Sequence, residues 1–245
     1  MSKPVLHRVD DFREALRHYK VSDLGRQKLA ETKLALLRAP SAGGRNTIIN
    51  ELVKTGKYES FVTDTTRPPR YNDGVLEQDG VEYWFRSEDD FFEDLSNGLY
   101  IEAEIIHGQQ VSGMSIRETE KAASHGKVAI SDIHFEGVEN VVSAKPDTFV
   151  IFITPPSFEE WIKRFRGRGQ ITEEEFQSRF ESAEHDYAHA LNNDYYRFVI
   201  NDSYLLSADH IRHIIETNDY PAGVNREARE VSEQVYERIK AELRP

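Results

Sequence analysis

Residues 39–47 carry the pattern with the clearest chemical meaning, a turn of small residues between a short apolar run and a helical stretch. This layout is typical of a phosphate-binding loop, whose usual pattern is G-x-x-x-x-G-K-[ST]. The chain has Ala39 in place of the first glycine and keeps Gly44. Arg45 and Asn46 stand where the lysine and the Ser or Thr are expected. That lysine neutralises the β- and γ-phosphates and that hydroxyl binds Mg²⁺, so the pattern predicts a nucleotide-phosphate site and also puts its activity in question.

The residues of this loop keep part of the usual chemistry. Backbone amides at Gly43 and Gly44 can form an anion-binding nest at a helix N-terminus. Arg45 is still a cation, although its planar head is bulkier than an ammonium group. Asn46 can bind Mg²⁺ weakly through its carbonyl oxygen, and Thr47 supplies the next hydroxyl. We expect the donor nucleotide to contact Ser41, Ala42, Gly43, Gly44, Arg45, Asn46 and Thr47.

A second candidate phosphate site lies in Thr65-Thr66-Arg67-Pro68-Pro69-Arg70. Two guanidinium groups, those of Arg67 and Arg70, sit on a turn stiffened by proline and can bind one phosphate bidentately. Tyr83 would add a hydroxyl donor. The competing interpretation is a pair of solvated surface arginines.

The composition limits the class of protein. The 245 residues suffice for one large domain, and a hydrophobic content of 38% supports a core. A net charge of −12 argues against nucleic-acid polymers and anionic membranes as partners. The chain has no cysteine and shows no apolar leader or membrane-length apolar run, which predicts a cytoplasmic protein without disulfides. His185 and His189 beside Asp186 have metal-ligand spacing, but this pattern is more typical of an exposed helix.

Alternating strand and helix patterns must position these groups. Strands are expected at 34–38, 59–64, 81–86, 99–106, 127–132, 148–153 and 197–200. Helices are expected at 45–55, 88–96, 115–124, 135–143, 158–166, from the Gly/Arg-rich break at 167–170 to about 190, and at 204–216. Ser157 can cap the helix that follows it. The alternation predicts an α/β fold with a mostly parallel sheet and a small strand-rich insertion.

Both ends of the chain have helical patterns. Apolar residues recur at helical spacing near the N-terminus, at Val9, Phe12, Leu16 and Tyr19. Residues 217–223 resemble a linker, and the tail beyond them has the apolar stripe of an amphipathic helix. We expect these helices to pack on the core, and the alternative is that they join two subunits in a homo-oligomer.

The segment Thr65–Arg70, followed by Asp79-Gly80-Val81-Glu82-Tyr83-Trp84-Phe85, resembles the guanylate kinase signature T-T-R-x-P-R…G-x-x-Y-x-F. Supporting segments follow in the family's order and spacing: Asn97–Glu102, Gly126–His134, Pro155–Gly169 and Ile200-Asn201-Asp202. The resemblance covers roughly residues 33–216.

For the acceptor, the resemblance implies that Arg67, Arg70 and Tyr83 hold the phosphate of GMP. Glu102 would select guanine, because one carboxylate can accept from N1–H and from the exocyclic amine together. Thr63 matches a serine of the family that contacts the base.

For the donor, the resemblance implies ATP and Mg²⁺. Arg164, Arg168 and Arg179 match lid arginines that close on the transferring phosphoryl group, where cations stabilise the transition state. Asn201 joins the ATP-binding set. The residues placed near Mg²⁺ are Asn46, Thr47 and Asp132.

The chain departs from the family at the base. Ser112 replaces a tyrosine that helps to hold the phosphate, and Met114 stands where a hydroxyl would donate to guanine O6, with Ser115 adjacent. His134 replaces the second aspartate of a D-[IV]-D pair whose first member, Asp132, is kept. A neutral imidazole can accept a hydrogen bond but cannot replace an anionic acceptor.

The sequence therefore predicts a P-loop nucleoside monophosphate kinase fold of three layers that transfers phosphate from ATP to GMP or a related monophosphate. One alternative is a weak or inactive domain that binds a phosphorylated ligand or phosphopeptide, and another is a kinase of a different phosphorylated acceptor. The predicted parts are a helical extension (1–32), the kinase-like domain (33–216) with its nucleotide-binding insertion (about 59–115) and lid (about 167–180), and a linker with a C-terminal helix (217–245).

Overall fold

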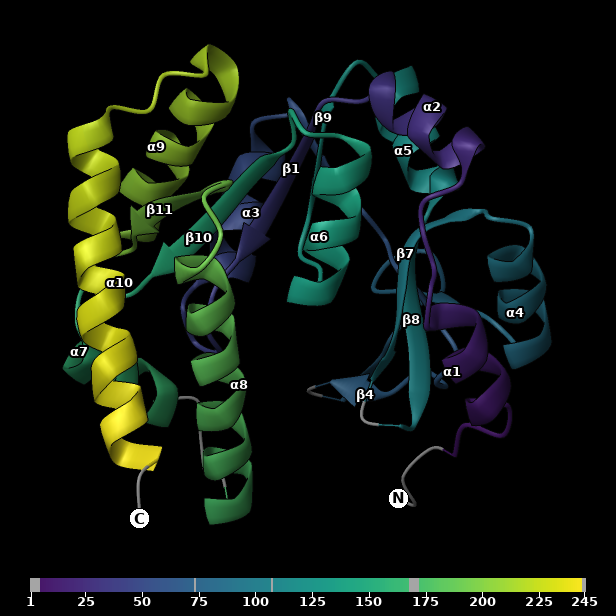
Figure 1. The fold of residues 1–245 in the computed structure, drawn as a ribbon, viewed down its shortest axis with the longest axis horizontal. Coiled ribbons are helices and arrows are strands. Elements are labelled where there is room, and N and C mark those ends of the chain that lie inside the picture. The colour runs from purple at the N-terminus through teal and green to yellow at the C-terminus, as the bar shows by residue number, and fades with distance from the viewer. Residues whose placement is uncertain (1–4, 73, 107, 168–171, 244–245) are drawn as a thin grey trace. The chain divides into compact units, whose positions relative to one another are not determined.

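The computed structural model describes residues 5–72, 74–106, 108–167 and 172–243 and divides into two compact units (Figure 1). Unit 1 comprises Met1–Leu34, Glu59–Ala129 and Glu136–Thr148. Unit 2 comprises Ala35–Tyr58, Ile130–Phe135 and Phe149–Pro245. In the described part of the chain, no helix is both long and apolar enough to span a membrane.

A five-stranded sheet has the order β11-β10-β1-β9-β2. Its strands are β1 (Leu34–Arg38), β2 (Tyr58–Ser60), β9 (Val128–Ser131), β10 (Phe149–Thr154) and β11 (Tyr196–Ile200). Parallel pairing joins β1 to β10 and β10 to β11. Every residue of β1 and β10 is buried, as expected for parallel strands covered by helices. The predicted α/β fold with a mostly parallel sheet is confirmed.

In the described residues, unit 2 contains the helices α3 (Arg45–Lys54), α7 (Phe158–Arg166), α8 (Glu173–Leu191), α9 (Tyr204–Thr217) and α10 (Ala222–Leu243). Helix α3 packs on α9, whereas α10 packs on α7, α8, β10 and β11. The hydroxyl of Ser157 accepts from the amide of Glu160 and so caps α7 as predicted. The C-terminal amphipathic helix thus covers its own chain within unit 2.

Unit 1 is built on a second sheet, in the order β6-β3-β8-β7. Its strands are β3 (Asp64–Thr65), β6 (Trp84–Phe85), β7 (Tyr100–Ile106) and β8 (Gln110–Ser115), with a separate hairpin of β4 (Tyr71–Asn72) and β5 (Val75–Leu76). Its helices are α1 (Val9–Leu16), α2 (Asp23–Ala30), α4 (Glu88–Ser96), α5 (Ile116–Ser124) and most of α6 (Phe135–Ala144).

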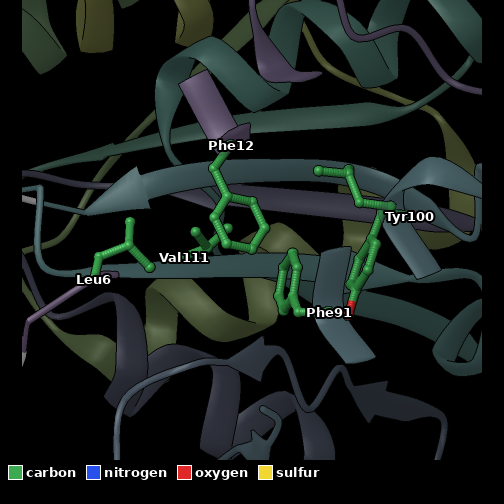
Figure 2. Packing of buried hydrophobic residues seen from close by; sticks show 6 residues of the cluster. Leu6, Phe12, Phe91, Tyr100 and Val111 are labelled. Carbon is green, nitrogen blue, oxygen red and sulfur yellow. The ribbon is translucent and has the colours of Figure 1, made fainter. Parts of the chain in front are cut away.

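The N-terminal residues complete the core of unit 1 (Figure 2). Phe12 of α1 is fully buried and meets the ring of Phe91 edge-on, with the ring centroids 5.9 Å apart. Phe91 in turn stacks on Tyr100 at 4.3 Å. Aromatic contacts of this kind add to the stabilisation from burial. The apolar spacing seen near the N-terminus therefore reflects packing of α1 on β7 and α4.

The strand predictions for unit 1 differ from the structure in several places, and the strand expected at 81–86 shortens to Trp84–Phe85. The strand expected at 59–64 is interrupted, because the amide of Val62 donates to the Glu118 carboxylate at 3.1 Å instead of continuing a strand ladder. Strand β8 was not predicted, since Gly113 weakens its strand pattern. A Cβ at Gly113 would lie 2.8 Å from Tyr100 Cδ1 and 2.9 Å from the Glu102 carbonyl oxygen, so close packing of β7 on β8 requires glycine there.

Candidate active site

The phosphate loop between β1 and α3 has a shape that depends on glycine. Gly44, at the start of α3, has φ of +93°, and Ala42 has φ of 66°. A Cβ at Gly43 would lie 2.8 Å from Ala39 Cβ and 2.9 Å from the Pro40 carbonyl oxygen. Among the residues that the structure describes, no side chain caps the first turn of α3, and that turn contains no acidic residue. Its amides and dipole therefore favour an anion.

Two side chains from other elements of unit 2 hold the loop. The indole nitrogen of the fully buried Trp161 donates to the Ser41 carbonyl oxygen at 2.7 Å. The carboxamide of Asn201, which follows β11, donates to the Gly43 carbonyl oxygen at 2.8 Å. A Cβ at Gly44 would lie only 2.2 Å from Asn201 Nδ2. The predicted ATP-site residue Asn201 thus supports the loop, and Trp161 is a support that the sequence reasoning missed.

Arg45 is the first residue of α3, and its contacts involve two of the predicted Mg²⁺ ligands. One guanidinium nitrogen pairs with the Asp132 carboxylate, and Nε donates to Asn46 Oδ1 at 3.3 Å. Asn46, Thr47 and Asp132 are exposed. Their oxygen atoms suit Mg²⁺, which is commonly held by one or two protein groups together with substrate phosphates and water. Among the described residues, no cluster of three acidic or histidine side chains forms a complete metal site.

A hollow of ≈ 320 Å³ opens beside the loop. The side chains that line it beyond the predicted loop residues are Arg38, Arg179, Ser182 and Asp186. Arg38 ends β1 and is buried; its NH1 group donates to the Ile133 carbonyl oxygen at 2.6 Å and its NH2 group pairs with Asp186 of α8. Burial raises the pKa of Asp186, and the Arg38 guanidinium opposes that shift. Sequence reasoning missed this pair, although a charged residue ending an otherwise apolar strand was a visible signal.

The three expected lid arginines have different positions. Arg179 lines the hollow, pairs with Glu175 and lies over the ring of Phe165, 5.5 Å from its centroid. Arg164 instead donates to the carbonyl oxygen of Asn201 at 2.8 Å, so in this structure it supports the chain that holds the loop. Arg168 lies outside the described residues.

Arg67, expected at the acceptor phosphate, is held by a carboxylate in unit 1. Its two terminal nitrogens contact the oxygens of Glu77 at 2.5 and 2.9 Å, in a bidentate pair with both side chains 6% exposed. The guanidinium lies 4.6 Å from the ring centroid of Tyr83. The backbone amide of Arg70 donates to the same Glu77 carboxylate at 2.9 Å. Arg70 is an exposed residue. The planar fork of Arg67 is thus occupied by the Glu77 carboxylate, a partner that sequence reasoning missed.

Glu102, expected to select guanine, is buried on β7 and lies close to α6. A Cβ at Gly137 of α6 would come within 2.8 Å of Glu102 Oε2 and 3.2 Å of Cδ. Glycine at position 137 therefore leaves the space that this carboxylate fills. Sequence reasoning missed Gly137, because nothing along the chain connects it to Glu102.

The other expected base residues of unit 1 lie on β8 or next to β3. Ser112 donates to the Thr65 hydroxyl oxygen at 3.2 Å, and Thr63 is half-buried. Met114 is fully buried. The hydroxyl oxygen of Ser115 is buried with no hydrogen-bond partner among the described residues. A buried hydroxyl without a partner is costly, so Ser115 is the member of this group best suited to receive a polar ligand atom.

Asp132 and His134, expected to complete the base site, belong to unit 2. The ring of His134 contacts Phe135, with the ring centroids 4.3 Å apart. Asp132 pairs with Arg45, as described above.

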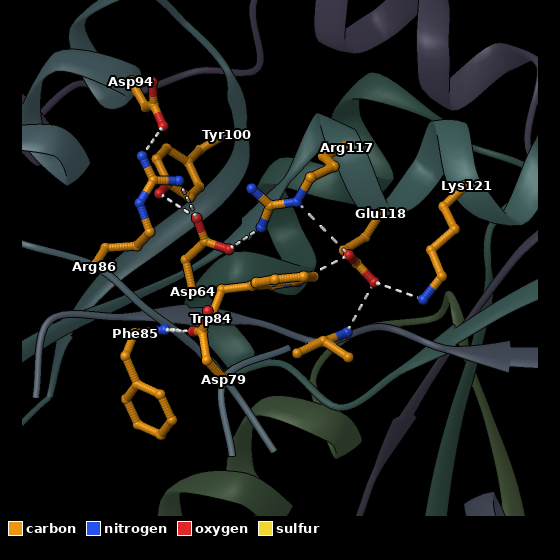
Figure 3. A network of polar contacts seen from close by, with 11 residues as sticks. Asp64, Asp79, Trp84, Phe85, Arg86, Asp94, Tyr100, Arg117, Glu118 and Lys121 are labelled. Atoms are coloured by element: carbon orange, nitrogen blue, oxygen red, sulfur yellow. Dashed lines mark hydrogen bonds and ion pairs between the residues drawn. The ribbon is translucent and has the colours of Figure 1, made fainter. Parts of the chain in front are cut away.

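A buried polar network in unit 1 positions the segment that carries Thr63 and Arg67 (Figure 3). Asp64 is fully buried; it accepts from the Tyr100 hydroxyl at 2.7 Å and pairs with Arg117 at 2.6 Å. Burial raises the pKa of Asp64, and these partners oppose the shift. Glu118 beside it accepts from the Trp84 indole nitrogen at 3.0 Å. Because a satisfied buried network fixes its members, β3 and β6 are held next to the residues that the sequence predicts for the acceptor.

Comparison with known proteins identifies the family that shares this fold and these motifs. The sequence profile of the guanylate kinase family matches residues 31–218. The chain belongs to the guanylate kinase family. It is 31% identical to the guanylate kinase of Bacteroides fragilis over 191 residues, which cover 77% of this chain and 91% of that protein. It is 37% identical to guanylate kinase 1 of Oryza sativa subsp. japonica over 153 residues, which cover 62% of this chain but only 39% of that longer protein.

The fold is also that of a solved guanylate kinase. The crystal structure of guanylate kinase from Anaplasma phagocytophilum matches with a TM-score of 0.56 and 24% identity, over 82% of this chain and 93% of that one. The structural likeness supports the shared fold, and the sequence matches establish the family.

Proposed function

We propose that this protein is a nucleoside monophosphate kinase that transfers the terminal phosphoryl group of ATP to GMP or a closely related monophosphate. The observation that carries the proposal is the phosphate loop, whose glycine-dependent shape is supported by Trp161 and Asn201 although the usual lysine is replaced. A scaffold that bound no donor nucleotide would have no need of this conformation. Family membership supports the same reaction, which is the one named for its relatives.

In this proposal, catalysis consists of positioning and charge neutralisation. The amides at the start of α3 and the cations Arg45 and Arg179 bind the donor phosphates. Mg²⁺, held near Asn46, Thr47 and Asp132, supplies further neutralisation of the phosphate charge. No covalent intermediate with the protein is required.

On the acceptor side, Arg67, Arg70 and Tyr83 hold the phosphate of the monophosphate. Glu102 accepts from the guanine N1–H and exocyclic amine, and the buried hydroxyl of Ser115 offers a hydrogen bond in place of the group that Met114 lacks. Thr63 and Ser112 add hydroxyls to the same site, and Asp132 and His134 of unit 2 are further proposed acceptor residues. Arg164 and Arg168 remain candidates for contact with the phosphoryl group after closure. A cytoplasmic location is part of the same prediction.

A second candidate is a domain that binds a phosphorylated ligand with little or no turnover. The pairing of Arg45 with Asp132 favours this second candidate, because Arg45 replaces the usual lysine and its charge is held by a carboxylate. A third candidate, a kinase of a different phosphorylated acceptor, is favoured by the complete burial of Met114.

An ADP-release assay with Mg²⁺-ATP and a panel of nucleoside monophosphates and sugar phosphates separates the three. The proposal expects the highest kcat/KM with GMP. Micromolar binding of GMP without ADP release would support the second candidate, and release with a non-guanine acceptor alone would support the third.

A further inference from the structure

In the described part of the chain, three arginines from different elements line the hollow beside the phosphate loop: Arg38, Arg45 and Arg179. Each is paired with a carboxylate, Arg38 with Asp186, Arg45 with Asp132 and Arg179 with Glu175. The Arg38–Asp186 pair is the most buried, with side chains 8% and 11% exposed, against 24% and 44% for Arg45 and Asp132. The hollow thus contains a buried cation that the phosphate-loop pattern does not include.

Stability alone is a weak reason for this pair. Removing two charges from water is costly, and replacing a buried ion pair by apolar residues of similar volume is often neutral or stabilising. Arg38 is the last residue of β1 and lies next to the phosphate loop in the chain. The other four residues of the strand are apolar, so the charge stands at the end that lines the hollow. A position that lines the hollow beside the phosphate loop gives the charge a use that a core position would not.

The geometry of Arg38 leaves room for a ligand. Guanidinium carries five N–H donors in a planar fork. In the described part of the chain, NH1 donates to the Ile133 carbonyl oxygen and NH2 to Asp186, and both contacts hold the group in one orientation. The remaining N–H groups can donate to a phosphate oxygen while the contact with Ile133 is kept.

We propose that Arg38 is a donor-phosphate ligand of this enzyme, a cation supplied by the end of β1 in addition to the one at the lysine position. The inference rests on the proposed function for the identity of the donor. Asp186 is then a positioning residue that orients Arg38 and compensates its charge before the nucleotide binds. Because Asp186 also lines the hollow, its negative charge opposes a bound polyphosphate, so the carboxylate and the phosphate compete for Arg38.

Two variants of the full-length chain separate this role from a structural one. Asp186→Asn removes the ion pair and keeps the cation, since Ile133 still accepts from Arg38 and the amide carbonyl can replace the carboxylate oxygen. The double variant Arg38→Met with Asp186→Asn removes the ion pair and the cation together. Both leave no uncompensated buried carboxylate.

Calorimetric titration measures the affinity of each variant for ATP and for inorganic tripolyphosphate, and thermal unfolding shows that each variant is folded. We expect Asp186→Asn to bind both probes at least about threefold more tightly than the wild type, and the double variant to bind them about tenfold or more weakly, as for loss of one charge-assisted hydrogen bond. GMP affinity should stay within about twofold in both, because neither variant changes a residue that is proposed to hold GMP. Should the methionine variant not fold, Arg38→Gln with Asp186→Asn serves the same purpose.

Affinity for tripolyphosphate that is equal in the two variants would overturn the proposal, because the pair would then act only on structure. The readout is independent of turnover. If the wild type fails to phosphorylate GMP but its tripolyphosphate affinity depends on Arg38, the proposed function fails and this inference stands. If GMP is phosphorylated and Arg38 has no effect on donor affinity, only this inference fails.

Discussion

The phosphate loop allows a sharp test, because helix α3 lies between two glycines with positive φ that differ in their surroundings. Gly44 at its start has φ of +93° and a hypothetical Cβ 2.2 Å from Asn201 Nδ2. Gly56, just after its end, has φ of +76° and open space around the same position. Alanine at either site must adopt a left-handed conformation, whereas only alanine at position 44 collides with another side chain.

The two costs can be estimated separately. A left-handed conformation costs a non-glycine residue about 1–2 kcal/mol, and this applies to both variants. In Gly44→Ala the Asn201 carboxamide must also move, which removes its hydrogen bond to the Gly43 carbonyl oxygen and adds about 1–3 kcal/mol. We expect the free energy of unfolding to fall by about 2–5 kcal/mol in Gly44→Ala and by about 1–2 kcal/mol in Gly56→Ala. Effects of alanine on the unfolded chain are common to both and cancel in the comparison.

Urea unfolding followed by circular dichroism measures the stability of both variants, and ATP titration measures the loop. ATP affinity should fall at least about tenfold in Gly44→Ala and remain unchanged in Gly56→Ala. Equal losses of stability in the two variants, with ATP affinity preserved in both, would refute the idea that Asn201 and Gly44 together shape a nucleotide site.

Two further predictions concern other parts of the fold. Gly137→Ala should weaken GMP binding by about tenfold, because its Cβ would displace the Glu102 carboxylate. The helical control Gly223→Ala, whose Cβ would have nothing within 4 Å, should leave GMP affinity unchanged. Equal GMP affinity in both variants would contradict the role of Glu102. Burial raises the pKa of Asp186 above its ordinary 3.8, so the folded state binds this proton more tightly than the unfolded chain. The stability that this carboxyl contributes is therefore fully present below its ordinary pKa and is lost as pH rises through the raised one. The free energy of unfolding of the wild type relative to Asp186→Asn should accordingly decrease as the pH rises above 3.8 in urea titrations, and a difference that stays constant or increases would show that the pKa is not raised.

Elements with a strong local pattern could be predicted from the sequence. The apolar run that forms β10 and the serine that caps α7 are examples, because burial on both faces and capping leave local signals. Strand β8 could not be predicted, since its glycine is explained only by the close approach of Tyr100 from β7. The interruption between β2 and β3 depends on Glu118, which is far along the chain.

In the candidate site, too, groups with a local pattern could be predicted and their distant partners could not. The phosphate loop and the arginines at 67 and 70 could be recognised because their spacing is local. The partners of these groups could not, since Asp186 lies 148 residues from Arg38 and Asn201 lies 158 residues from Gly43. Glu77 lies only ten residues from Arg67, but an irregular segment with a hairpin separates them, and no periodic pattern predicts that they meet.

The most direct test of the account is the formation of GDP by the purified wild-type chain supplied with Mg²⁺-ATP and GMP, followed by phosphorus NMR. We predict that GDP and ADP appear together in equal amounts, and that omitting GMP abolishes ADP formation. If GMP and ATP both bind yet no GDP forms over many hours at high protein concentration, the fold has kept the ligands of a kinase without its reaction, and the proposed function is wrong.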